Sequence, residues 1–123
     1  MTNIISKMSS IGVACLLLAC GASATTLTIK NDDTAKVNVV VEPGNGTITP
    51  SSPAVKQIVK PGEEISLTIN KELLDNADTF SIKGSVNVPS PHNKCGPLSF
   101  SNNYKIVFVS GKLGTVICTH EAQ

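Results

Sequence analysis

The chain has 123 residues, of which 41% are hydrophobic and only 3% aromatic, and it contains four cysteines and no tryptophan. This length fits one domain, and ten basic residues, all of them lysine, nearly balance nine acidic ones. A chain with so little net charge has no electrostatic steering towards nucleic acid or an anionic membrane surface, and its few aromatic rings cannot form a base-stacking platform.

The N-terminal segment has the pattern of an export signal. Residues 1–10 carry one charged side chain, Lys7, and the apolar run 11–20 follows. This run is about half of the ~20 residues that a helix needs to cross a bilayer, and Ala22-Ser23-Ala24 then offers a small-residue cleavage site. We therefore predict a signal peptide over residues 1–24 and a mature chain over residues 25–123 that has no transmembrane segment.

A second processing site overlaps the first. The leader contains the run Leu17-Leu18-Ala19-Cys20-Gly21, which resembles the bacterial lipobox, whose cysteine becomes the acylated first residue of a lipoprotein. This resemblance implies an outer-membrane lipoprotein anchored through Cys20, whereas a signal peptide alone implies a secreted or periplasmic protein. Both alternatives place the chain in or beyond the envelope of a bacterium.

The mature segment shows the two-residue periodicity of half-buried β-strands. Apolar and polar residues alternate over seven runs, at 26–30, 37–42, 54–59, 65–70, 80–88, 104–109 and 115–119. Turn-forming sequences separate the runs, among them Asn31-Asp32-Asp33, the Pro- and Gly-rich loop 43–53, Lys60-Pro61-Gly62 and the hairpin turn 110–114.

Two positions depart from simple strands. Residues 71–76 can form a single helical turn, which we expect Asn70 to cap and which we expect to cross between two sheets. Gly84 interrupts the run 80–88, and we expect it to mark a β-bulge.

About seven short strands without alternating helices predict an all-β fold, an antiparallel β-sandwich. The runs Leu27–Asn31, Val37–Val41 and Ile58–Ile69, the last with its Pro61-Gly62-Glu63 turn, resemble the pattern of exported bacterial immunoglobulin-like β-sandwich domains. The resemblance implies an immunoglobulin-like sandwich over residues 25–123. It implies no catalytic or ligand-binding residue, because unrelated functions share this fold.

The mature chain keeps an even pair of cysteines, Cys95 and Cys118. In an oxidising compartment such a pair predicts one intrachain disulfide. The bond would stabilise a small domain by roughly 3 kcal/mol, because it closes a loop in the unfolded chain.

The sequence contains few candidates for catalytic or metal-binding residues. The two histidines, His92 and His120, stand in no hydrolase or metalloprotease motif, and together with the two cysteines they do not reproduce a zinc-ligand spacing. The paired carboxylates Asp32-Asp33 and Glu63-Glu64 flank turns and lack the regular spacing of a calcium loop. We therefore expect no enzymatic activity, no cofactor and no metal ion.

The loop from Pro89 to Pro97 is the candidate binding site. Its prolines restrict the backbone, it holds His92 and Lys94, and Cys95 would fix its base to the last strand. The candidate residues are Pro89, Pro91, His92, Asn93 and Lys94. The alternative interpretation is a plain crossover loop held by the disulfide. The loop 43–53 is a second candidate.

These observations predict a secreted, non-enzymatic β-sandwich that acts as a bacterial effector or accessory protein. We expect it to bind another macromolecule, for which a protein is the first candidate. Nucleic acid is not an expected partner. The alternative is an envelope lipoprotein anchored at Cys20 with a structural or assembly role.

Overall fold

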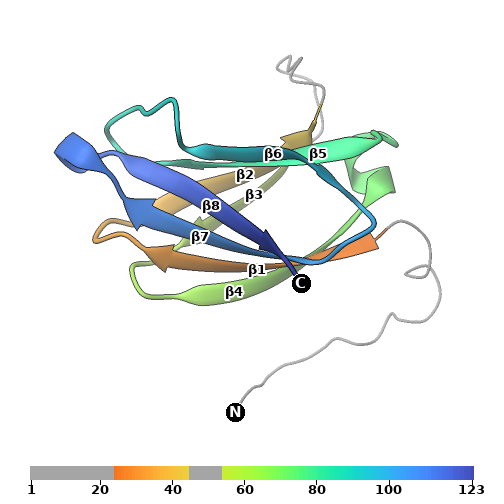
Figure 1. The fold of residues 1–123 in the computed structure, drawn as a ribbon, viewed down its shortest axis with the longest axis horizontal. Helices are drawn as coiled ribbons and strands as arrows, with labels where there is room; N and C mark the ends of the chain where they lie inside the picture. Colours follow the sequence, from red (N-terminus) through yellow and green to blue (C-terminus); the bar gives the residue numbers. More distant parts are fainter. Residues whose placement is uncertain (1–23, 45–53) are drawn as a thin grey trace, which may run out of the picture.

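The computed structural model describes residues 24–44 and 54–123. The predicted signal peptide up to residue 23, with Cys20, and residues 45–53 of the second candidate loop lie outside the described residues. Two four-stranded sheets pack face to face in the described part, as the sequence predicted for an all-β sandwich (Figure 1). The strands are β1 (Ala24–Asp32), β2 (Val37–Pro43), β3 (Val55–Val59), β4 (Glu64–Asn70), β5 (Thr79–Ser85), β6 (Lys94–Ser99), β7 (Tyr104–Ser110) and β8 (Val116–Ala122).

The strand order shows how the chain passes between the layers. Sheet A has the order β4-β1-β7-β8, and sheet B has the order β3-β2-β5-β6. All neighbours are antiparallel except β1 and β7, which run parallel. Parallel neighbours need a long crossover connection, and here the chain from β1 to β7 passes through sheet B.

The structure has eight strands where the sequence predicted about seven. The additional strand is β6, whose residues the sequence placed largely in the loop Pro89–Pro97. Gly96 and Pro97 interrupt the alternation of apolar and polar residues that would identify a strand. Proline is tolerated here because β6 lies at the edge of sheet B.

The predicted bulge at Gly84 is wrong. The register shift lies between Phe80 and Ile82, opposite Gly96, whose φ is +130°. Gly84 has a different role, since a Cβ there would lie 2.5 Å from the Phe108 ring. Its missing side chain therefore lets the two sheets approach closely.

The alternating apolar residues form the core, as predicted. Side chains from both sheets are completely or almost completely buried, among them Leu27, Ile29, Val37, Val39, Val41, Ile69, Phe80, Ile82, Ile106 and Phe108. The strands thus bury one face each, and burial at roughly 25 cal/mol per Å² of apolar surface is the main stabilising term.

Two predicted connections are present. The turn after β3 has Gly62 at φ +77° and a hydrogen bond from the Glu63 amide to the Lys60 carbonyl. A 3₁₀-helix, η3 (Lys71–Leu74), crosses from sheet A to sheet B and buries Leu74. The predicted cap is wrong, however, because the Asn70 side chain makes no capping hydrogen bond to the helix.

Asn31, near the end of β1, joins the two sheets through its side chain. The side chain is fully buried, and its Nδ2 donates hydrogen bonds to the carbonyls of Ala35, at 2.9 Å, and of Val59, at 2.8 Å. Val59 ends β3 in sheet B, while Oδ1 accepts the Asp33 amide at 2.8 Å. A side chain of β1 thus fixes both the β1–β2 turn and the edge strand of the other sheet.

The Asn31 backbone adds two more contacts. Its amide donates to the Glu63 carbonyl at 3.0 Å, and its carbonyl accepts the Gly62 amide at 2.8 Å. Both partners lie in the turn between β3 and β4, so three connected segments meet at this residue. Buried polar groups of this kind are favourable only when they are paired, and the side chain of Asn31 uses both its donors and its acceptor.

We predict that Asn31→Ala lowers the free energy of unfolding by about 3 kcal/mol, because it leaves the buried Val59 carbonyl and the Asp33 amide without their partner. Asn38→Ala is the matched control. Asn38 is exposed on β2, so its loss should change stability by less than about 0.5 kcal/mol. Urea denaturation of both variants measures the difference, and equal stabilities would contradict the role assigned to Asn31.

Candidate functional site

Two connections form one end of the sandwich, which we call the tip: the β5–β6 loop, residues 86–93, and the β7–β8 hairpin, residues 111–115 (Figure 1). The two loops lie against each other, since a Cβ placed on Gly114 would be 3.5 Å from Cγ2 of Val88. The tip contains most of the binding loop predicted from the sequence, and it adds a hairpin that the sequence did not single out.

The Cys95–Cys118 disulfide forms as predicted and lies at the base of the tip. It joins β6 in sheet B to β8 in sheet A, with the two Cα atoms 5.7 Å apart. Both are edge strands, so the bond closes the side of the sandwich opposite the strands β3 and β4. The disulfide therefore links the two sheets where the tip loops leave them.

Hydrogen bonds attach the β5–β6 loop to both sheets beside the disulfide. The Cys118 amide of sheet A donates to the His92 carbonyl at 2.9 Å, and the Gly84 amide of sheet B donates to the Asn93 carbonyl at 3.0 Å. The Asn93 side-chain amide donates in turn to the Gly84 carbonyl at 2.6 Å. The end of this loop is thus anchored by its backbone, while Pro89, Pro91 and His92 are exposed.

Lys94 does not belong to this loop. It begins β6, and its Nζ lies 3.6 Å from a carboxylate oxygen of Glu42 on β2. The sequence placed Lys94 in the loop because Gly96 and Pro97 concealed the strand. As a correction, Lys94 belongs to the outer face of sheet B and lies outside the tip.

The hairpin carries an exposed apolar side chain on an unusual backbone. Leu113 is 92% exposed and has φ +56° and ψ +34°, in the left-handed region. This conformation costs a residue with a Cβ roughly 1–2 kcal/mol. The sequence offered a weak signal in the run Gly111-Lys112-Leu113-Gly114, where a leucine stands in a tight turn between glycines.

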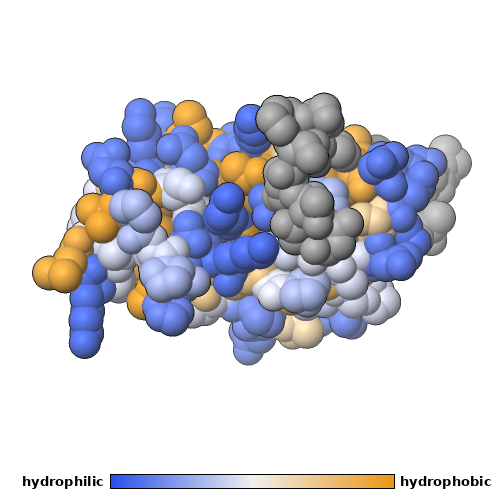
Figure 2. Space-filling model, turned by 90° about the horizontal axis from the view of Figure 1, so that it is seen from above, coloured by the Kyte–Doolittle hydropathy of each residue, from blue (hydrophilic) through white to orange (hydrophobic). Residues whose placement is uncertain are grey.

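Val88 extends this apolar surface. Its side chain is 39% exposed in the neighbouring loop, and the exposed Pro89 and Pro91 follow it. Figure 2 shows hydrophobic residues reaching the surface among hydrophilic ones at the same end of the molecule. Exposed apolar groups grouped on a supported loop are typical of contact surfaces.

The structure does not bring the two histidines together with a nucleophile. His92 lies in the tip, whereas the His120 ring packs edge-on against Tyr104 with a centroid separation of 6.4 Å. Tyr104 begins β7, whose far end leads into the tip. The two imidazoles therefore occupy different parts of the sandwich.

The carboxylates next to turns accept hydrogen bonds from residues in or near those turns. Asp33 Oδ1 accepts the Thr34 amide at 2.6 Å and the Ser110 hydroxyl at 3.1 Å, and Glu63 Oε1 accepts the Lys60 amide at 2.8 Å. Within residues 24–44 and 54–123, no group of three or more His, Cys, Asp or Glu side chains is arranged to hold a metal ion.

None of the helices in the described ranges has the length and apolar character to span a membrane.

Comparison with known proteins assigns the chain to no family. No protein-family model matches the chain. No curated protein matches it significantly. Among solved structures, it is similar to an NMR structure of a protein from Eubacterium rectale, with 12% identity and a TM-score of 0.49, over 80% of this chain and 89% of that chain.

Proposed function

We propose that this chain is an exported, non-enzymatic binding protein that contacts a protein partner through the tip. The observation that carries the proposal is Leu113, almost fully exposed on a left-handed backbone at the end of a hairpin. A leucine in water at this position contributes nothing to the core. Its conformation also costs free energy in the folded chain.

Binding to a partner surface with an apolar pocket would offset the free energy that the Leu113 conformation costs. Burying a leucine side chain contributes about 1.5–3 kcal/mol, and the neighbouring Val88 would add to it. The disulfide and the hydrogen bonds from Cys118 and Gly84 hold the loops before binding, so less conformational entropy is lost on association. These features favour a small preformed contact site for a protein.

The Cys95–Cys118 bond also supports export, because disulfides persist in oxidising compartments. It fits a secreted or periplasmic protein released by cleavage of the predicted signal peptide. The lipobox resemblance at Leu17–Gly21 supports the second candidate, an outer-membrane lipoprotein anchored at Cys20 with a structural or assembly role. The tip would be available for contact in either form.

We predict that Leu113→Asn lowers the affinity for the partner at least tenfold and leaves the fold intact. Asparagine tolerates the left-handed conformation better than leucine does, so stability should be equal or slightly higher. Leu73→Asn is the matched control, since Leu73 is 48% exposed on η3 at the other end of the sandwich. Chemical cross-linking in the native host, followed by affinity measurement with the cross-linked protein, compares the variants.

The result expected is one partner cross-linked by the unmodified chain and by Leu73→Asn but not by Leu113→Asn. Retention of the same partner at the same affinity in Leu113→Asn would overturn the tip as the contact site. A hydrolytic activity that disappears in His92→Ala or His120→Ala would instead replace the binding proposal with an enzymatic one.

Localisation has its own test, the intact mass of the chain recovered separately from the culture fluid and the membranes of the host. We predict a soluble species beginning at Thr25 whose mass rises by two hydrogens on reduction of the disulfide. A membrane species beginning at an acylated Cys20 would establish the lipoprotein alternative instead.

A further inference from the structure

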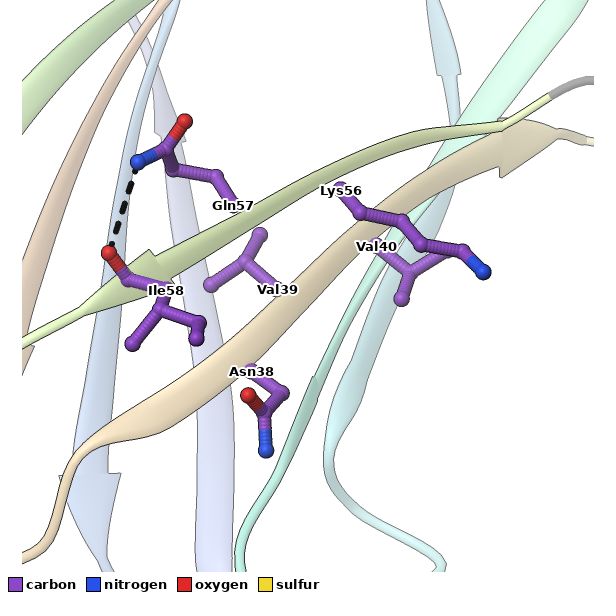
Figure 3. Close-up of a pocket in the computed structure, with 6 residues that line it drawn as sticks. All are labelled: Asn38, Val39, Val40, Lys56, Gln57 and Ile58. Atoms are coloured by element: carbon purple, nitrogen blue, oxygen red, sulfur yellow. Dashed lines mark hydrogen bonds between the residues drawn. The ribbon is translucent and has the colours of Figure 1, made fainter.

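The outer face of sheet B carries a second surface, which shares no residue with the tip. An open groove of about 610 Å³ lies at β2 and β3, and of the residues that line it Asn38, Val40, Lys56 and Ile58 belong to the outer face, while Val39 and Gln57 belong to the opposite one (Figure 3). Ile58 is 51% exposed beside Val40, so the groove has an apolar part. Because β3 lies at the edge of sheet B, the groove is open on that side.

The strand register adds a row of lysines to this groove. Lys56 pairs with Val40, Val40 with Lys83, and Lys83 with Lys94, so one lateral row runs across all four strands. Directly opposite residues share a face of the sheet. The buried neighbours Val39, Val41 and Ile82 point to the core, which places the lysine row on the outer face.

The positive charge of this row is only partly neutralised. Like charges directly opposite each other, such as Lys83 and Lys94, are unfavourable, and Glu42 compensates them from β2. Its carboxylate is 5% exposed and lies 4.0 Å from Lys83 Nζ and 3.6 Å from Lys94 Nζ. A single carboxylate thus serves two ammonium groups, and among the described residues none of the ion pairs involves Lys56.

The spacing of the row suits an extended peptide. Neighbouring strands lie about 4.8 Å apart, so Lys56 and Lys94, three strands apart, are separated by roughly 14 Å at the backbone. Side chains i and i+4 of an extended chain lie on the same face about 13 Å apart, with i+2 between them. A peptide crossing the strands would then bring two acidic side chains to Lys56 and Lys94 and one apolar side chain to the middle of the row, beside Val40.

We propose that the outer face of sheet B binds an acidic segment of a partner protein with the pattern acidic-x-apolar-x-acidic. The unbalanced lysines supply the charge complementarity, and the half-buried Val40 in the middle of the row contacts the central apolar residue. The proposal stands whether or not the tip binds a partner, because the two surfaces share no residue.

The test uses the purified chain with its disulfide intact and a fluorescent peptide that contains two copies of Glu-Ser-Leu-Ser-Glu. Fluorescence anisotropy at low salt should show saturable binding that weakens at least tenfold when the glutamates are replaced by glutamine, and at least fivefold when the leucines are replaced by serine. Binding should also fall as salt rises, since exposed charges are screened.

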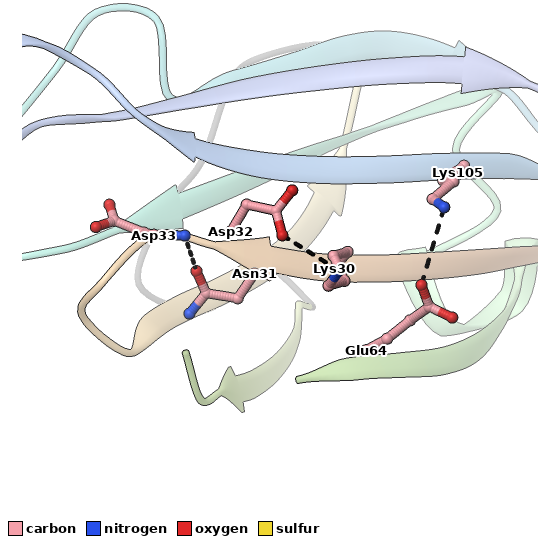
Figure 4. A network of polar contacts seen from close by, with 6 residues as sticks. All are labelled: Lys30, Asn31, Asp32, Asp33, Glu64 and Lys105. Carbon is pink, nitrogen blue, oxygen red and sulfur yellow. Dashed lines mark hydrogen bonds and ion pairs between the residues drawn. The ribbon is translucent and has the colours of Figure 1, made fainter. Parts of the chain in front are cut away.

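Variants of the protein locate the contact. Lys56→Gln and Val40→Thr should each weaken peptide binding about fivefold or more, while Lys105→Gln should not change it. Lys105 is the matched control because it lies on the outer face of sheet A, 3.9 Å from Glu64 (Figure 4). Urea denaturation midpoints would show that all three variants remain folded.

Three outcomes would overturn the proposal. The first is the absence of saturable binding at millimolar peptide. The second is equal binding of the leucine-free peptide, or of polygalacturonate as an acidic polysaccharide, which would make the face a general anion surface. The third is an equal loss of binding in Lys105→Gln, which would remove the assignment to sheet B.

Discussion

The buried amide of Asn31 connects the two sheets on one side of the sandwich, and the other features of this end depend on it. Its donors reach the β1–β2 turn and the last residue of β3, and its backbone pairs with the turn that follows β3. On the opposite side, the Cys95–Cys118 bond connects β6 to β8. One polar contact and one covalent bond thus hold the two sheets at both margins of the same end.

This arrangement explains why loops rich in proline and glycine can keep a defined shape at the tip. A small domain with few aromatic residues has limited apolar surface to bury. The tip loops contribute little to the core, so their order depends on the disulfide and on the hydrogen bonds from the Cys118 and Gly84 amides at their base. The exposed Leu113 can then be presented in one conformation, which is the property that a small contact site requires.

The sequence predicted the features that depend on local periodicity. Alternation identified the buried faces of β1, β2 and β7, and the Pro61-Gly62 pair identified its turn, because both follow from nearest neighbours along the chain. The pairing of Cys95 with Cys118 was predictable because the predicted mature chain contains no other cysteine.

Features that depend on residues distant in sequence were not predictable in this way. The parallel pairing of β1 with β7 arises from the crossover between sheets, and β6 is a strand only because it lies at an edge where Pro97 is tolerated. Asn31 looked like an ordinary turn residue, since its partner Val59 lies 28 positions away. The exposure of Leu113 likewise depends on the hairpin geometry, and its left-handed backbone conformation has no signature in an isolated leucine.

The central claim is that the tip is ordered before any partner binds. Backbone ¹⁵N relaxation of the free protein measures this order at the amides of residues 86–93, except Pro89 and Pro91, and of residues 111–115. We expect backbone order parameters near 0.85 in both tip loops, equal to those of the flanking strands. Values below about 0.6 in both loops would contradict it, because the tip would then be flexible and its contact site would form only on binding.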